Sequence, residues 1–317
     1  MFGGINLYRS LDGGATNTVM SRWQNYHTGG LSAHCDQHVI VPHIDYGNGN
    51  ATVFFGNDGG IQKSILGFAT QPLVGWVNLA NNLGVTQFWH GAVNADGSVI
   101  LGGTQDNDTI RFRRGDGPQA WYQAETGDGG YCAFDPSNPN IMYSCYPYLQ
   151  MEKSIDGGQS WFEYHNGITE TGNPDLAPFV SPFALDNLNP STLLAGGESI
   201  WMTTNGGANW VSVLGPRAGW PMCSSVEISP HVGVSTCFVG YNDGSIWRTE
   251  NGADTWVEVE PAAGGSIPTN WIMDIEISPH NPNVVLAGLA GYFDNRVWMS
   301  FNGGDTWVNR SGTDETA

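Results

Sequence analysis

The chain has 317 residues, of which 44 are Gly and 13 are Trp, and only 13% are charged. Its net charge of −19 argues against nucleic acid as a partner, because nucleic-acid binding needs a basic patch, and against an anionic membrane surface. No apolar run is long enough for a spanning helix, so we expect no membrane insertion. The first residues, Met1 to Asn6, lack the basic and apolar regions of a signal peptide.

One short pattern recurs along the chain at intervals of about fifty residues, which indicates a repeated supersecondary unit. The clearest copy is Ser-Ile-Asp-Gly-Gly-Gln-Ser-Trp at residues 154–161. Asp or Asn followed by Gly favours a tight turn, and the Ser or Thr two residues earlier can form hydrogen bonds across it. The acidic or amide position falls on Asp12, Asp116, Asp156, Asn205, Asn251 and Asn302, and a degraded copy has Leu66 there.

This pattern resembles the Asp-box, or BNR repeat, of sialidases, family 74 glycoside hydrolases, sortilin-type receptors and photosystem assembly factors. The resemblance implies an all-β fold: a β-propeller of four-stranded antiparallel blades, seven-bladed with an incomplete first blade. It does not imply one function, because enzymes and non-enzymes share the motif.

In chain order, residues 1–30 are expected to hold only the third and fourth strands of an incomplete blade, at 5–9 and 18–23. Residues 31–310 form six complete blades of the same domain, and residues 311–317 are a polar tail. In the sixth blade the strands are expected at 222–229, 234–241, 245–249 and 256–259. The missing strands suggest that the chain is a fragment, or that further blades or a partner chain complete the ring.

The five cysteines form two pairs and one remainder. Cys132 and Cys145 flank one turn and Cys223 and Cys237 flank another, so the sequence predicts the disulfides Cys132–Cys145 and Cys223–Cys237 and leaves Cys35 single. Such bridges would place the protein in an oxidising compartment, secreted or at the cell surface. The alternative is five buried thiols in a reducing compartment.

Function is expected on the face where the first (A) strand of each blade starts and the second (B) strand ends. Polar and aromatic side chains gather there, and they suit sugars, which offer apolar C–H faces and hydroxyl groups. The predicted ligand-binding residues are His34, Asp36, His38, Asn57, Asp58, Trp89, Gln105, Asp106, Asn107, Tyr148, Trp220, Tyr241, Trp271 and Tyr292. The wider set on this face adds Gln87, Asp128, Tyr131, Phe179, Glu198, Asn242, Asp243 and Asp294.

A metal site is one hypothesis within this face. His34, Asp36 and His38 alternate along an expected strand, so their side chains would share one side and could bind a divalent cation. A simple hydrogen-bonded network at the strand start is the alternative that we favour. We expect that no cofactor is required, while a divalent cation remains one hypothesis.

Four carboxylates on the face are candidate catalytic groups: Asp36, Asp58, Asp106 and Asp128. The surrounding patterns are similar to a glycoside-hydrolase-like or sortilin-like subgroup of secreted bacterial proteins. A glycosidase needs two carboxylates facing each other across a cleft, and the sequence does not select a pair. A sialidase is not expected, because its arginine clamp has no counterpart on this face.

The leading functional hypothesis is therefore recognition of a carbohydrate or a protein ligand without catalysis. The first alternative is a glycoside hydrolase acting on a polysaccharide. The second is a structural module of a larger surface assembly.

Overall fold

The computed structural model describes residues 1–25, 32–80, 83–84, 86–118, 120–260, 265–291 and 295–312. The chain forms two compact units, unit 1 (Met1–Gln87) and unit 2 (Phe88–Ala317). The described residues form strands joined by turns, with three single-turn 3-10 helices: η1 (Trp23–Asn25), η2 (Gly67–Ala69) and η3 (Arg114–Asp116). None of the described helices is long and apolar enough to cross a membrane.

Unit 1 contains two antiparallel sheets. The first sheet is blade 1, which consists of β1 (Phe2–Gly3), β2 (Leu7–Arg9) and β3 (Thr18–Ser21). The second is blade 2, with β4 (Gln37–Pro42), β5 (Val53–Asn57), β6 (Gly60–Ser64) and β7 (Trp76–Asn78). The short strand β1 was not expected from the sequence. It pairs Phe2 with Tyr8 and Gly3 with Leu7, so blade 1 has three strands rather than two.

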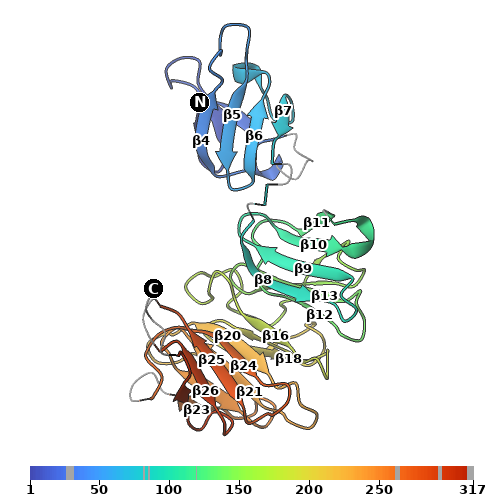
Figure 1. Cartoon of the computed structure of the whole chain (residues 1–317), viewed down its shortest axis with the longest axis vertical. Coiled ribbons are helices and arrows are strands. Elements are labelled where there is room, and N and C mark those ends of the chain that lie inside the picture. The colour runs from blue at the N-terminus through green and yellow to red at the C-terminus, as the bar shows by residue number, and fades with distance from the viewer. Residues whose placement is uncertain are drawn as a thin grey trace. The chain divides into compact units, whose positions relative to one another are not determined.

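Unit 2 contains five four-stranded antiparallel sheets (Figure 1). Blade 3 is β8 (Phe88–Val93), β9 (Val99–Thr104), β10 (Thr109–Arg113) and β11 (Trp121–Glu125), and blade 4 is β12 (Cys132–Phe134), β13 (Met142–Tyr146), β14 (Gln150–Ser154) and β15 (Phe162–Glu163). Blade 5 is β16 (Phe183–Leu185), β17 (Leu193–Gly196), β18 (Ile200–Thr203) and β19 (Val211–Leu214). Blade 6 is β20 (Cys223–Ile228), β21 (Cys237–Tyr241), β22 (Ile246–Thr249) and β23 (Val257–Glu260), and blade 7 is β24 (Ile272–Ile277), β25 (Val285–Leu289), β26 (Val297–Ser300) and β27 (Val308–Asn309).

The A strands of successive blades in unit 2 are neighbours. Strand β8 lies beside β12, β12 beside β16, β16 beside β20, and β20 beside β24, while each blade runs outward in chain order from its A strand to its D strand. Radially arranged antiparallel blades with their first strands innermost define a β-propeller. The predicted all-β propeller fold is confirmed, and the strands of blade 6 fall within three residues of the predicted bounds at either end.

The apolar core is divided among the boundaries between blades. In unit 2, Leu101 and Phe134 pack between blades 3 and 4, Leu149 and Phe183 between blades 4 and 5, Leu194 and Val226 between blades 5 and 6, and Phe238 and Ile272 between blades 6 and 7. Strand β17 is buried along its whole length because other blades cover both faces of its sheet. In unit 1, Leu7, Met20, Phe55 and Trp76 form the corresponding cluster.

The turn between the C and D strands is held by the same side-chain hydrogen bonds in blades 1, 4, 5, 6 and 7. In blade 4, Ser154 Oγ donates to Asp156 Oδ1 (2.9 Å) and accepts from the Gly158 N–H (2.8 Å). Asp156 Oδ1 also accepts from the Ser160 N–H (2.9 Å). The equivalent bonds surround Asp12, Asn205, Asn251 and Asn302.

These bonds favour the charged form of the carboxylate. Hydrogen bonds, first from the Ser160 hydroxyl, hold the pKa of Asp156 well below its usual range, and those from Thr16 lower the pKa of Asp12 to about 2. The asparagines in three blades make the same backbone contacts without a charge. We call this arrangement the box turn.

Two of the seven copies do not form a box turn. Around Asp116 the hydroxyl position is occupied by Arg114, and residues 114–116 form η3 instead. Near Leu66 the hydroxyl of Ser64 bonds with Thr70, since no carboxylate or amide is available at position 66. The assignment of Asp116 to a structural box is therefore wrong.

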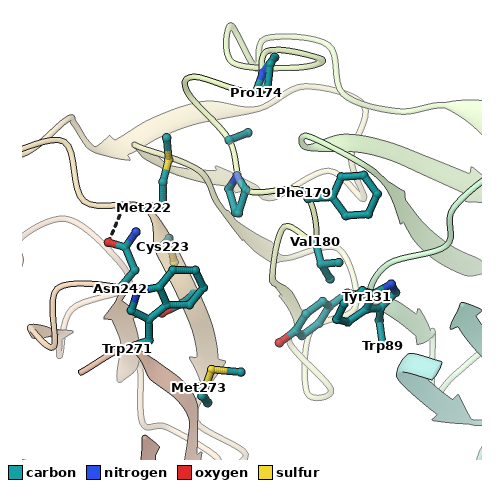
Figure 2. Close-up of a pocket in the computed structure, with 13 residues that line it drawn as sticks. Trp89, Tyr131, Pro174, Phe179, Val180, Met222, Cys223, Asn242, Trp271 and Met273 are labelled. Carbon is teal, nitrogen blue, oxygen red and sulfur yellow. Dashed lines mark hydrogen bonds between the residues drawn. The ribbon is translucent and has the colours of Figure 1, made fainter. Parts of the chain in front are cut away.

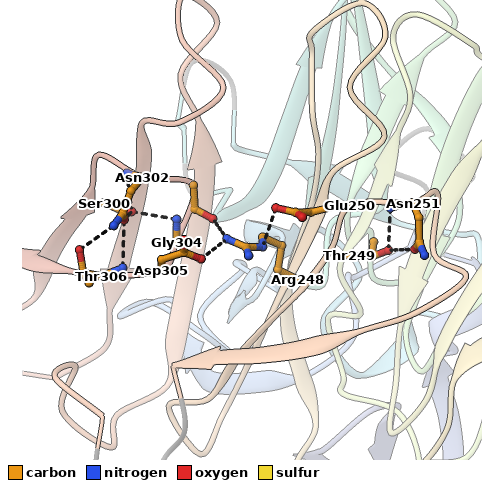
Figure 3. A network of polar contacts seen from close by, with 10 residues as sticks. Arg248, Thr249, Glu250, Asn251, Ser300, Asn302, Gly304, Asp305 and Thr306 are labelled. Atoms are coloured by element: carbon orange, nitrogen blue, oxygen red, sulfur yellow. Dashed lines mark hydrogen bonds and ion pairs between the residues drawn. The ribbon is translucent and has the colours of Figure 1, made fainter.

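Basic side chains on C strands reach the box turn of the next blade. Lys153 Nζ donates to Gly206 O (2.9 Å), and Arg113 Nη2 donates to Gly157 O (2.9 Å). Figure 3 shows Arg248 of blade 6 beside the box turn of blade 7, where it donates to Gly303 O and to Asp305 Oδ1 (2.8 Å). Blade 5 has Met202 at the position of Lys153 and Arg248, directly before the box hydroxyl.

The structure overturns both predicted disulfides, since none of the five cysteines forms a disulfide bond. Cys132 faces Ser144 in the β12–β13 register, so Cys145 points to the opposite side of the sheet. Cys223 faces Tyr241 and Cys237 faces Ile228, which separates the two sulfurs by the length of the strand pair, roughly 16 Å. Four of the thiols are buried, and the cysteines therefore give no support for an oxidising compartment.

Removing the box hydroxyl is expected to destabilise unit 2. Ser154→Ala should lower the free energy of unfolding by about 1–3 kcal/mol, because it leaves the buried Gly158 N–H without its acceptor. Urea titration of the variant measures this loss. The control is Ser212→Ala at an exposed position of β19, which should change stability by less than about 0.5 kcal/mol. Equal effects of the two substitutions would contradict the role assigned to the turn.

The thiols can be counted by mass spectrometry. Alkylation in denaturant without a reductant should add five groups, and prior reduction should not change that number. In the native protein only Cys35 should react readily, because burial raises the pKa of Cys132 and Cys237 to about 12. Fewer than five adducts before reduction would show that a bridge exists.

Candidate functional site

Unit 2 contains a cleft of about 430 Å³ where the A strands of its blades begin. Figure 2 shows Met222, Asn242, Trp271 and Met273 of blades 6 and 7 on one side and Trp89 and Tyr131 of blades 3 and 4 on the other. The loop between β15 and β16 lies between them. The remaining lining residues are Pro174, Ala177, Pro178, Phe179, Val180, Cys223 and Ser224.

β-Bulges place three of these side chains. The register shifts by one residue at Trp89 in β8, at Ser224 in β20 and at Met273 in β24. A bulge leaves the extra residue outside the ladder and redirects its side chain. Each of the three extra residues lines the cleft, so the irregular starts of the A strands shape the site.

Aromatic side chains in and beside the cleft are open to solvent. Trp271 is 55% exposed, and Trp89 and Phe179 are each 41% exposed. Large aromatic side chains are usually buried, and several exposed ones around a cleft mark an interaction site.

Tyr131 supplies a hydroxyl group to the cleft, into which it points in Figure 2. Its ring stacks on His90 with centroids 4.4 Å apart, and the Cys132 N–H donates to His90 Nδ1 (3.3 Å). Burial lowers the pKa of His90, so the imidazole is neutral with its proton on Nε2. Burial, together with the nearby Asp274, raises the pKa of Tyr131 to about 12, which keeps its hydroxyl a donor at neutral pH.

Asn242 is the second polar group of the cleft. Its side-chain Oδ1 accepts from the Met222 backbone N–H (3.1 Å), and its backbone N–H donates to Met222 O (3.0 Å). These bonds fix the amide so that Nδ2 is left to donate to a ligand. The described lining residues include no carboxylate and no cationic group, so the cleft offers aromatic faces and neutral hydrogen-bonding groups.

Three carboxylates lie on the A strands next to the cleft. Glu227 is on β20, and Asp274 and Glu276 are on β24, one and three residues after Met273. Burial, then the neighbouring Glu276 and Asp274, raises the pKa of Glu227 to about 8, and burial also raises the pKa of Asp274. The Ile277 N–H donates to Glu227 Oε1 (3.5 Å), so Glu227 joins the two blades. The sequence analysis did not single out these residues.

The predicted metal site in unit 1 does not have the geometry that the sequence suggested. Asp36 has a left-handed backbone (φ 56°) and β4 begins only at Gln37, so His34, Asp36 and His38 do not alternate along one strand. His34 is buried, whereas His38 is exposed and its Nε2 pairs with Asp58 Oδ1 (2.5 Å). The three predicted ligands do not gather as one metal-binding group among the described residues. Asn57 is buried and donates to Gln62 Oε1 (2.5 Å), a structural contact.

The acidic turn of blade 3 connects it to blade 4. The Asp106 N–H donates to Asp128 Oδ1 (2.8 Å), and Asn107 Nδ2 donates to Gln105 O (3.2 Å). Asp128 therefore orders the neighbouring turn, and these residues are not among those lining the cleft. Asp36 and Asp58 belong to unit 1, whereas Asp106 and Asp128 belong to unit 2.

The four remaining predicted aromatic residues have four different positions or outcomes. Tyr148 packs edge-on against Phe179 (5.6 Å between centroids) and supports the cleft wall. Tyr241 is fully buried, so it cannot contact a ligand in this structure. Trp220 is 70% exposed, two residues before Met222. Tyr292 lies outside the described residues.

The sequence analysis missed the loop between β15 and β16, which contributes Pro174, Ala177, Pro178 and Val180 to the cleft. Its length was the available signal, because a long connection inside a compact domain is often functional. The bulged residues Ser224 and Met273 were also missed, and no local pattern in the sequence marks them.

No protein-family model matches the chain, and no curated protein matches it in sequence. Similar solved structures include a family 74 glycoside hydrolase (GH74) from Niastella koreensis (17% identity, TM-score 0.56), the GH74 xyloglucanase from Xanthomonas campestris (16%, 0.56) and an ancestral GH74 enzyme (18%, 0.59). These matches cover 85%, 85% and 88% of this chain but only 44%, 44% and 39% of the enzymes. The chain thus spans less than half the length of these enzymes.

YCF48 bound to D1 peptide is a further match, at 13% identity and a TM-score of 0.52 over 89% of this chain and 82% of that one. At such identities the likeness shows the β-propeller fold alone.

Ionisation of Glu227 is expected to make stability depend on pH. The folded state holds a proton up to about pH 8, whereas the unfolded chain releases it near pH 4.5, so stability should fall as the pH rises between these values. Glu227→Gln removes the carboxyl group and with it this pH-dependent loss of stability. The variant should be more stable than the parent by about 2 kcal/mol at pH 8, with little difference at pH 5. Urea midpoints from pH 5 to 9 measure the effect.

The matched control is Asp254→Asn, at an exposed position between β22 and β23. The urea midpoint of this variant should change with pH in the same way as that of the parent. A parallel curve for Glu227→Gln as well would show that the Glu227 carboxylate is not buried.

Proposed function

We propose that this protein is a secreted or cell-surface member of the Asp-box propellers and that it recognises a neutral polysaccharide through the cleft of unit 2. The observation that carries the proposal is the lining itself, in which aromatic rings surround a few uncharged donors. A sugar ring places C–H groups on an aromatic face and directs its hydroxyl groups to neighbouring polar atoms.

The individual groups fit these roles. Trp271 and Trp89 offer exposed indole faces from opposite sides of the cleft, while Tyr131 and Asn242 offer a hydroxyl and an amide. Because the lining is uncharged and the whole chain carries a net charge of −19, an acidic polysaccharide would be repelled.

The similar GH74 structures support a carbohydrate ligand, and the xyloglucanase among them suggests xyloglucan as a first ligand to test. Hydrolysis is the alternative, and it requires two carboxylates across the bound sugar. The described lining of the cleft has none, so we favour binding without cleavage.

A peptide is the second candidate ligand. Two methionines and two prolines, Met222, Met273, Pro174 and Pro178, make part of the lining apolar and adaptable, which suits an apolar peptide side chain. The propeller YCF48, solved with a bound peptide, supports this reading.

Trp271→Ala is expected to weaken binding of xyloglucan about tenfold or more, because it removes the most exposed aromatic face of the cleft. Affinity electrophoresis in gels containing xyloglucan or polygalacturonate measures binding, and the acidic polymer should not retard the parent protein. The control is Phe162→Ala, an exposed aromatic on the outer strand β15, which should bind as the parent does.

The gels, together with a peptide-binding assay, separate the two candidate ligands. If neither the parent nor any variant is retarded by a neutral polysaccharide, while an apolar peptide binds and Trp271→Ala abolishes that binding, the ligand is a peptide. Release of reducing ends from xyloglucan by the parent would establish hydrolysis instead.

A further inference from the structure

The segment Arg217–Met222, between β19 and β20, is fastened at both ends to one turn of blade 6. At its start, Arg217 Nη1 donates to Ser245 Oγ (2.6 Å) and lies 3.7 Å from Asp243 Oδ2. At its end, Met222 exchanges hydrogen bonds with Asn242. Both anchors belong to the turn between β21 and β22, so the segment has little freedom to shift as a whole.

Arg217 is the stronger of the two anchors. Its guanidinium lies over the rings of Tyr241 (4.6 Å) and Trp247 (4.8 Å), and its Nη2 donates to Glu258 Oε1 (3.1 Å). The side chain is only 14% exposed. A planar guanidinium stacked on two rings and paired with carboxylates is held in one geometry.

Trp220 lies between these anchors and is presented to solvent. It has a left-handed backbone (φ 59°), follows Gly219 (φ 91°), and its N–H donates to Arg217 O (3.2 Å). A bulky residue rarely adopts this conformation, and an indole gains nothing from being 70% exposed in the free protein. Strained residues of this kind persist where the surroundings enforce them, and they cluster at ligand sites.

We infer that Trp220 is a second stacking subsite next to the cleft, so that the ligand is a chain of several sugar units rather than a mono- or disaccharide. This inference rests on the proposed function. Trp220 is two residues from Met222, a lining residue, so the Cα atoms of these two residues lie at most about 7 Å apart. A chain seated against Trp271 in the cleft would place a later unit on the Trp220 indole, and Arg217 positions that indole without touching the ligand.

Isothermal titration of the full chain with cellobiose and cellohexaose tests the inference. These β-1,4-linked glucose chains have flat apolar faces and differ only in length. Trp220→Ala should weaken cellohexaose binding about three- to tenfold and leave cellobiose binding unchanged. Trp271→Ala should weaken both, while Trp220→Phe, which keeps a ring, should stay near the parent. Val232→Ala, an exposed apolar residue between β20 and β21, is the control without effect.

Each other outcome has a definite meaning. If Trp220→Ala binds cellohexaose as the parent does, or weakens both sugars equally, the second subsite does not exist, although the proposed function stands. If the parent binds neither these sugars nor xyloglucan, the proposed function fails, and this inference with it.

Discussion

Two hydrogen bonds of one Ser or Thr hydroxyl close the C–D turn in five blades. The hydroxyl donates to the Asp or Asn side chain two residues later and accepts from the backbone N–H four residues later. In these blades the turn links the end of the third strand to the start of the fourth. In Ser154–Gly158 both partners are buried or half-buried, so the turn does not compete with water. Since the turn is local, each of these five blades carries the information for its own hairpin.

The blades are joined by a second layer of contacts. Each boundary in unit 2 has its own apolar cluster, and Arg113, Lys153 and Arg248 connect a C strand to the box turn of the next blade. Met202 breaks this series between blades 5 and 6, where a cavity of about 190 Å³ lies beside Gly252. Stability is therefore distributed over the boundaries rather than concentrated in one centre, as in other repeat architectures.

The box turns and the contacts between blades stabilise the sheets, so the other end of the blades, where the A strands start, can carry irregular backbone. Bulges at Trp89, Ser224 and Met273 and the left-handed Trp220 all lie at or before the starts of A strands. Such conformations are unfavourable locally, and the rigid sheets beneath them hold them in place. The cleft obtains its shape from these irregularities, and its neutral chemistry follows from which side chains they turn inward.

The sequence by itself determined the repeat, the turn chemistry and the strand order, because these depend on residues within one hairpin. It also indicated that Trp89 and Trp271 belong to a functional face, since both stand at strand starts. Only the tertiary structure decided the register, and a one-residue difference in register separates Cys132 from Cys145 and turns Met273 into the cleft. Burial was likewise decided by packing between blades: it removed Tyr241 from the surface, brought Glu227 against Glu276 and Asp274, and left Trp220 exposed. Contacts between residues about fifty positions apart cannot be read from a local pattern, because they depend on how whole sheets pack.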